Sequence, residues 1–195
     1  MINKRSLIAV FIIVAIIQLA VPAKMIWDNE STLKSGKEFK FETAPVDPTD
    51  PFRGKYITLE FKENSYNIEP GTKWQEGENV YVILNTNSKG FATIKNLSKE
   101  KPAEGLDYVK AKIQYITGPQ LDNVIISYPF DRFYMEEFKA YEAEKAYNET
   151  QLNSIKTTYA LVNIRQGKAA LKDVMIDGIS IVDIVRKNQL ENKDD

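Results

Sequence analysis

The chain has neither cysteine nor histidine among its 195 residues. Without cysteine there can be no disulfide framework, thiol nucleophile, thiolate zinc site or lipid-modified cysteine. Without histidine, the Ser-His-Asp triad, the HExxH zinc motif and imidazole proton shuttles are excluded as well. The 26 basic and 27 acidic side chains nearly cancel, which argues against a nucleic-acid binder, because such proteins neutralise phosphates with a basic face. We therefore expect no cofactor, no metal and no nucleic acid as ligands.

The only long apolar run lies at the N-terminus, where Lys4 and Arg5 precede residues 7–23. As a helix this run spans about 26 Å, and extension to Trp27 brings it to the roughly 30 Å thickness of a bilayer core. Basic residues before a membrane span stay in the cytoplasm, and tryptophan favours the membrane interface. The sequence thus predicts a signal anchor, or transmembrane helix, at residues 1–27. We expect the rest of the chain to be extracytoplasmic, on the periplasmic or cell-surface side of the cell membrane.

A second interpretation of this segment stays open. Val21, Pro22 and Ala23 have the small-x-small spacing of a signal-peptide cleavage site. The sequence alone therefore leaves the choice between an uncleaved anchor and a segment that is cut after Ala23.

Most of the remaining chain has the periodicity of β-strands. After a connector and first strand at 28–43, alternation over 55–62 places Ile57, Leu59 and Phe61 on one face, as in a half-buried strand. Hairpins are predicted at 79–97 and around the turn Gln166-Gly167-Lys168. Further strands are expected at residues 108–116, 124–128 and 179–185.

One segment has helical spacing instead. Tyr134, Phe138 and Tyr141 lie at i, i+4 and i+7 within an alanine-rich stretch, which predicts one central helix at 134–147 with its aromatic side toward the core. The predicted fold is α+β, mostly antiparallel β, with the choice between barrel and sandwich open. We expect a β-rich domain at 44–186 and a disordered tail at 187–195, which is charged and lacks apolar spacing.

The candidate site lies in a loop that is rich in aspartate and proline. Three prolines between residues 44 and 54 hold the chain extended. Asp47, Asp50 and Arg53 could converge, as acid/base pairs and sites for hard cations require. The alternative is turn chemistry, in which the aspartates cap turns and Arg53 pairs locally. We favour this structural interpretation.

For two serine–lysine pairs, a catalytic interpretation must likewise be weighed against a structural one. Ser31 with Lys34, and Ser98 with Lys101, fit the S-x-x-K spacing of serine acyl enzymes. That motif should open a buried helix, whereas these serines are expected in a connector and after a strand. A signal-peptidase-like Ser-Lys hydrolase is therefore kept only as an alternative, together with a small-ligand-binding β-barrel.

The sharpest motif spans residues 45–61, Pro-Val-Asp-Pro-Thr-Asp-Pro-Phe-Arg-Gly-Lys-Tyr-Ile-Thr-Leu-Glu-Phe. It resembles the signature of the GDYXXLXY family of bacterial membrane-anchored proteins, in which a P-x-D-P-x-D-P-x-R run precedes the motif. Gly54, Tyr56 and Leu59 match the glycine, first tyrosine and leucine of the motif. Lys55 replaces its aspartate, and Phe61 replaces its final tyrosine.

Both departures favour an architectural role over a catalytic one. Lys55 reverses the charge where an essential carboxylate would stand, and Phe61 keeps the ring without the hydroxyl, as a packing position permits. The resemblance implies a membrane-tethered extracytoplasmic domain that works with a polytopic membrane protein, and it brings no activity with it. We expect a non-enzymatic binding or assembly module for an envelope or membrane partner. The interaction motif of this module would comprise Asp47, Asp50, Arg53, Gly54, Tyr56 and Leu59.

Overall fold

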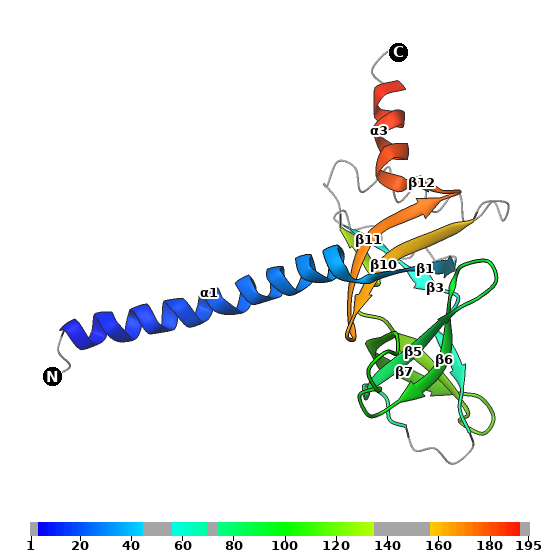
Figure 1. Ribbon diagram of the computed structural model, residues 1–195, viewed down its shortest axis with the longest axis horizontal. Helices are drawn as coiled ribbons and strands as arrows, with labels where there is room; N and C mark the ends of the chain where they lie inside the picture. The colour runs from blue at the N-terminus through cyan, green and yellow to red at the C-terminus, as the bar shows by residue number, and fades with distance from the viewer. Residues whose placement is uncertain (1–3, 45–55, 70–73, 135–156, 192–195) are drawn as a thin grey trace.

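A computed structural model describes residues 4–44, 56–69, 74–134 and 157–191, and it shows one long helix leading into a β-rich body (Figure 1). The α+β class that the sequence predicts is confirmed. The elements are, in chain order, α1 (Lys4–Ser35), β1 (Lys37–Ala44), β2 (Tyr56–Thr58), β3 (Glu60–Phe61), β4 (Ser65–Asn67), β5 (Asn79–Thr86), β6 (Ala92–Ser98), β7 (Tyr108–Thr117), β8 (Asn123–Ser127), β9 (Arg132–Tyr134), β10 (Thr158–Arg165), β11 (Lys168–Ile176), β12 (Ile179–Ser180) and α3 (Ile181–Glu191).

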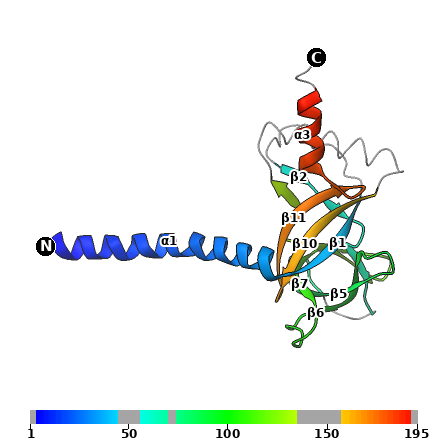
Figure 2. The same ribbon diagram turned by 45° about the horizontal axis from the view of Figure 1, so that its top comes forward.

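Two five-stranded antiparallel sheets form the body. One has the order β12-β11-β10-β1-β3, the other has the order β4-β8-β7-β5-β6, and β2 pairs separately with β9. The two sheets meet at isolated bridges that join Lys40 to Phe91 and Val109 to Gly167. Strands β11, β10 and β1 curve around the body (Figure 2), so the arrangement is a nearly closed, barrel-like one. This resolves the choice between barrel and sandwich that the sequence leaves open.

The centre of the core is an aromatic cluster made of Phe41, Phe61, Tyr128 and Phe130. Their ring centroids lie 4.9 to 5.8 Å apart, most of them in edge-to-face geometry. All four side chains are buried, and aromatic pairs of this kind add about 0.5–1.5 kcal/mol each beyond the area that they bury. The Tyr128 hydroxyl donates a hydrogen bond to the Glu63 carbonyl at 2.8 Å. Burial raises the pKa of Tyr128, so this phenol stays neutral.

The burial pattern predicted for the strand at 55–62 is confirmed, but the segment forms two short strands that pair with different neighbours. Ile57, Leu59 and Phe61 are buried, as the alternation predicts. However, β2 pairs with β9, whereas β3 pairs with β1. Between them the Leu59 amide donates a hydrogen bond to the Asp131 carbonyl at 2.8 Å. The chain therefore changes neighbours at this point, as strands do at the corner of a barrel.

Both predicted hairpins are confirmed, as β5 with β6 and β10 with β11. The strands expected at 108–116 and 124–128 are also present, as β7 and β8. The short strands β4 and β9 were not predicted. Each has only three residues, too few for a period of two to stand out in a sequence.

The start predicted for the central helix is wrong. Tyr134 belongs to β9 and is 64% exposed, with its ring against Tyr56 of β2 at a centroid distance of 5.3 Å. Pairing of β9 with β2 thus outweighs the local helical spacing. Residues 135–156, which hold the rest of the predicted helix, lie outside the described residues.

The C-terminal strand and tail are corrected as well. Only Ile179–Ser180 is a strand, and α3 then runs from Ile181 to Glu191 where a strand to Val185 and a disordered tail from 187 were expected. The Ser180 hydroxyl accepts a hydrogen bond from the Val182 amide at 3.2 Å, which makes Ser180 the N-cap of the helix. Ile181 and Val185, four residues apart, are fully buried.

Two hairpin turns provide a matched test of how the barrel closes. Gln166-Gly167 and Asp177-Gly178 both have positive φ at each residue, the geometry of a type I′ turn. A Cβ on Gly167 would lie 2.8 Å from a ring carbon of Tyr108, whereas a Cβ on Gly178 would have nothing within 4 Å. The turns thus share their backbone conformation and differ in one steric contact.

We expect Gly178→Ala to lower the free energy of unfolding by about 1 kcal/mol, the cost of a left-handed conformation in a residue with a Cβ. Gly167→Ala should cost at least about 1 kcal/mol more, because the added methyl group must displace the Tyr108 ring. Urea unfolding of the detergent-solubilised chain, followed by tyrosine and tryptophan fluorescence, measures both values. Equal losses in the two variants would contradict the close approach at Gly167.

Candidate functional site

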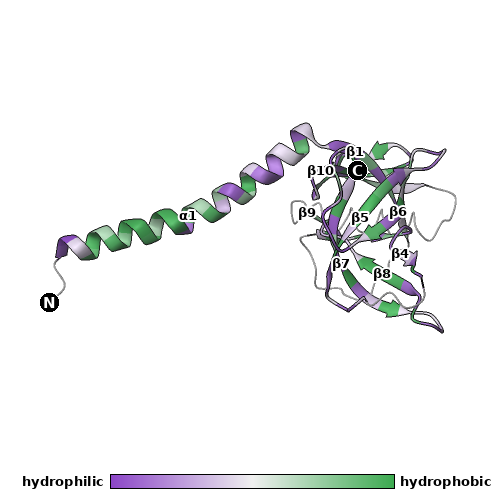
Figure 3. Cartoon of the chain, turned by 60° about the horizontal axis from the view of Figure 1, so that its bottom comes forward, coloured by the Kyte–Doolittle hydropathy of each residue, from purple (hydrophilic) through white to green (hydrophobic). Residues whose placement is uncertain are grey.

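Helix α1 is apolar on all sides in its N-terminal part, and the body does not cover it. Its most apolar 18-residue window has none of its residues buried, and Trp27 is 76% exposed. The apolar part extends away from the body (Figure 3). A helix that is apolar on all sides needs an apolar environment around it, so α1 is a candidate membrane anchor.

The helix does not stop where the anchor was expected to stop. The polar connector predicted from residue 28 is wrong, because α1 continues to Ser35. Ion pairs at i, i+4 support this extension, joining Lys24 to Asp28 at 3.0 Å and Glu30 to Lys34 at 3.4 Å. Such spacing of opposite charges is typical of helices, and it is the signal that the sequence analysis missed.

Gly36 ends the helix and permits its contact with the sheet. Its amide donates a hydrogen bond to the Thr32 carbonyl at 2.9 Å. A Cβ at this position would lie 2.5 Å from that carbonyl oxygen and 3.1 Å from the Ile164 amide nitrogen. Only a glycine therefore lets the helix end lie this close to β10. The chain passes from α1 into β1 with only Gly36 between them.

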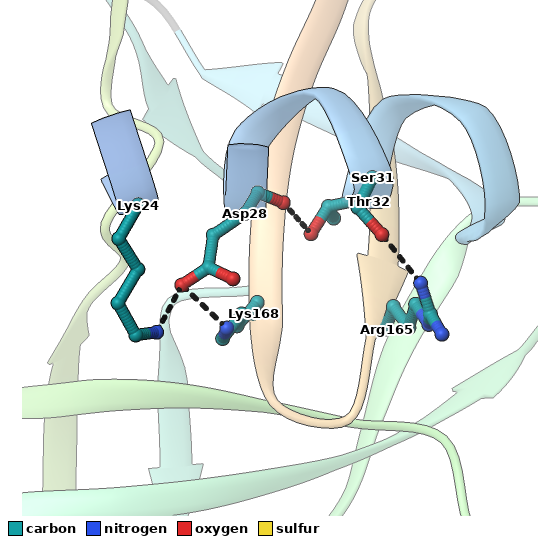
Figure 4. Close-up of polar contacts among 6 residues, drawn as sticks. All are labelled: Lys24, Asp28, Ser31, Thr32, Arg165 and Lys168. Carbon is teal, nitrogen blue, oxygen red and sulfur yellow. Dashed lines mark hydrogen bonds and ion pairs between the residues drawn. The ribbon is translucent and has the colours of Figure 1, made fainter. Parts of the chain in front are cut away.

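Charged groups hold the last turns of α1 against the turn between β10 and β11 (Figure 4). We call this contact, between residues 28–36 and residues 163–168, the helix–hairpin junction. The Asp28 carboxylate lies 2.7 Å from the Lys168 ammonium and 3.0 Å from that of Lys24. Hydrogen bonds from Lys168 and then from Lys24 lower the pKa of Asp28 below its ordinary value of 3.8. These ion pairs are thus fully present above that ordinary pKa and are lost as the pH falls through the lower folded one.

Hydrogen bonds from the hairpin to uncharged groups of the helix complete the helix–hairpin junction. Arg165 donates hydrogen bonds to the hydroxyls of Ser31 at 2.5 Å and Ser35 at 2.8 Å. The Asn163 side-chain amide donates to the Leu33 carbonyl at 2.6 Å, and Asn163 is itself buried. Since a carbonyl near a helix C-terminus has no partner within the helix, this bond from the sheet satisfies it.

A hollow of about 650 Å³ lies beside the helix–hairpin junction, between α1 and the sheet that contains β7 and β8. Its walls are mostly apolar and it is partly open to solvent. It is lined by Met25, Asp28, Asn29 and Thr32 of the helix and by residues 79, 110–112, 127–129 and 167–169 of the body. The hollow therefore lies outside the barrel, beside α1, and is not the closed barrel pocket that a small-ligand carrier would have.

The predicted interaction motif is only partly described. Asp47, Asp50, Arg53 and Gly54 lie outside the described residues, so their convergence stays a prediction. Tyr56 is half-buried in β2, and the Arg132 guanidinium lies over its ring at 5.1 Å.

The last two positions of the motif, the matched Leu59 and the substituted Phe61, are core residues. Leu59 and Phe61 are 2% and 4% exposed, and Phe61 belongs to the aromatic cluster. In this structure they support the fold, as the replacement of tyrosine by phenylalanine at 61 suggests.

Neither S-x-x-K motif pairs its serine with its lysine in the part of the chain that the structure describes. The Ser31 hydroxyl faces Arg165, while Lys34 pairs with Glu30. The Ser98 hydroxyl donates to the Glu100 carbonyl at 2.7 Å. Among the described residues, no group of three acidic side chains is placed to hold a metal ion.

Comparison with known proteins gives one match. Residues 18–174 match a family model described as GDYXXLXY protein. No curated protein and no solved structure matches the chain. The matched span runs from within α1 into β11, so it includes the residues of the helix–hairpin junction as well as the motif at 54–61.

The helix–hairpin junction predicts a fixed angle between α1 and the body. Because the chain has no native cysteine, spin labels at Ile26→Cys and Lys95→Cys report a single distance between the helix and β6. We expect a narrow distance distribution from double electron–electron resonance. Asp28→Asn with Arg165→Gln should broaden it, because these changes remove the charged contacts between helix and hairpin.

The matched control is Glu30→Gln with Lys34→Gln. It also removes one acidic and one basic side chain, but both belong to α1 and pair with each other at 3.4 Å. This control should leave the distribution narrow. A broad distribution before any substitution, or equal broadening in both double variants, would contradict a fixed helix–hairpin junction.

Proposed function

The chain belongs to the GDYXXLXY family, and we propose that it is a membrane-anchored extracytoplasmic module that binds an envelope or membrane partner and catalyses no reaction. The observation that carries this proposal is the continuity of α1 from its apolar part into the helix–hairpin junction. A body attached in this way stands at one height and one angle above the membrane. A flexible linker would allow neither.

A fixed orientation favours binding to a partner that is also fixed in the membrane. Surfaces that are already ordered lose less conformational entropy when they bind. Two proteins held in one bilayer also meet at a high effective concentration, so a modest interface is enough for association. A polytopic membrane protein of the same membrane is therefore the partner that this geometry suits best.

The side of the membrane follows from charge. Lys4 and Arg5 precede the apolar part of α1, and the excess of basic residues stays in the cytoplasm. We therefore infer that α1 is an uncleaved signal anchor and that the body lies outside the cytoplasm.

Single cysteines can test this topology, because the chain has no other. Glu104→Cys, in the loop before β7, should react in intact cells with a maleimide that cannot cross the cytoplasmic membrane. Ser6→Cys, at the start of α1, should react only after that membrane is permeabilised. The reverse pattern would overturn the proposed orientation, and a mature chain that lacks the Ser6 site would show that the segment is cut.

The partner claim has a test of its own. We expect replacement of Asp47, Asp50 and Arg53 by alanine to abolish crosslinks between the full-length protein and its membrane partner in cells. The matched control replaces Asp173, Asp183 and Arg186 by alanine. It changes the net charge by the same amount, but in the C-terminal part of the chain. Unchanged crosslinks with a folded triple variant would refute a role for the aspartate–proline loop at the interface.

A further inference from the structure

We propose that the hollow beside α1 binds an anionic phospholipid of the membrane that holds the anchor. This proposal rests on α1 being a membrane anchor, but not on which side of the membrane the body occupies. We call the hollow of about 650 Å³ between α1 and β7–β8 the membrane-proximal groove.

The position of the groove places it at the membrane surface. Met25 lines the groove and belongs to the predicted anchor at 1–27, and Asp28 and Asn29 line the next turn. Trp27, which favours the interface, is exposed between them. One edge of the groove is therefore the same helix that contacts lipid, and a neighbouring lipid can enter sideways without leaving the bilayer.

The groove has the size and the walls of a ligand site. Its volume lies within the range of roughly 300–1,000 Å³ that is typical of small-molecule sites. Met25, Pro129 and Ala169 give it mostly apolar walls. Such walls suit the glycerol backbone and upper acyl chain of a lipid better than they suit a free ion.

The charge around the groove selects a negative head group. Its lining contains three lysines and one carboxylate, and that carboxylate, Asp28, is already paired with Lys168 at 2.7 Å. Lys110 and Lys112 are exposed, on either side of the buried Ala111. Alternate residues of a strand share one face, so these two ammonium groups lie on the same side of β7. Within the described residues, neither has a carboxylate at salt-bridge distance.

An amphiphile combines the two properties that the membrane-proximal groove requires. An acidic segment of a protein would satisfy Lys110 and Lys112 but would leave the apolar walls uncovered. A zwitterionic lipid would cover the walls, but its head group carries no net charge for the lysines. An anionic phospholipid satisfies both.

Native mass spectrometry of the full chain, released from detergent in the presence of phosphatidylglycerol or phosphatidylcholine of the same acyl composition, tests the proposal. We expect retained phosphatidylglycerol adducts on the unmodified chain and few phosphatidylcholine adducts. Lys110→Gln with Lys112→Gln should reduce the retained phosphatidylglycerol by about tenfold, because each basic residue near an anionic lipid surface contributes severalfold to binding. The control Lys95→Gln with Lys101→Gln removes the same charge from exposed positions outside the groove and should retain the lipid.

A second pair of variants tests the walls without changing any charge. Asn29→Trp should fill the groove from the helix side and displace the lipid, whereas Ile26→Trp, which does not line the groove, should not. Circular dichroism checks that each variant is folded.

Equal retention of the two lipids by the unmodified chain would overturn the proposal, as would equal loss in both lysine pairs. Binding of an octaglutamate peptide in place of phosphatidylglycerol would overturn it too and would indicate a protein-docking site. Because the assay is insensitive to membrane side, a failed topology experiment and a failed lipid experiment remain distinguishable.

Discussion

The contact between the end of α1 and the turn of the β10–β11 hairpin is the constraint on which the rest of the structure depends. Gly36 brings the helix end against β10, and Arg165 and Lys168 reach back from the hairpin to the helix. Individually, exposed pairs of this kind contribute only about 0–1 kcal/mol. Together, however, they fix the direction of the body relative to α1.

The same hairpin also closes the barrel. The Lys110 amide donates a hydrogen bond to the Gly167 carbonyl at 2.9 Å, and Val109 bridges to Gly167. Gly167 is required there because any side chain would meet the Tyr108 ring. One short turn therefore contacts α1 and joins the sheet that contains β10 and β11 to the sheet that contains β7. The membrane-proximal groove forms where these three parts meet, so its shape depends on all of them.

The sequence predicts the parts of this structure that depend on local patterns. Hairpins appear where alternating runs meet turn residues, as at Gln166-Gly167. Prediction fails where a segment's neighbours decide its conformation. Residues 179–185 are predicted as a strand, but the N-cap at Ser180 and the burial of Ile181 with Val185 make the chain helical from Ile181 onward. Tyr134 fits a helix by spacing, yet β2 holds it as a strand.

The site was less predictable than the fold. The aspartate–proline loop stands out in the sequence because its composition is unusual, whereas the helix–hairpin junction joins residues about 130 positions apart, and no local pattern brings them together. The sequence does contain the i, i+4 pairs Lys24 with Asp28 and Glu30 with Lys34, which favour a helix that continues beyond residue 27. Once the bounds of α1 are known, Gly36 can be recognised as the residue that ends the helix.

A nitroxide scan of residues 24–35 in lipid nanodiscs tests this account most directly. If α1 runs unbroken into the body, side-chain mobility must vary with a period of 3.6 residues through Ser35 and must be lowest where the helix faces β10 and β11. Uniformly mobile spectra from residue 28 onward would show a flexible tether and would contradict a body oriented by its anchor.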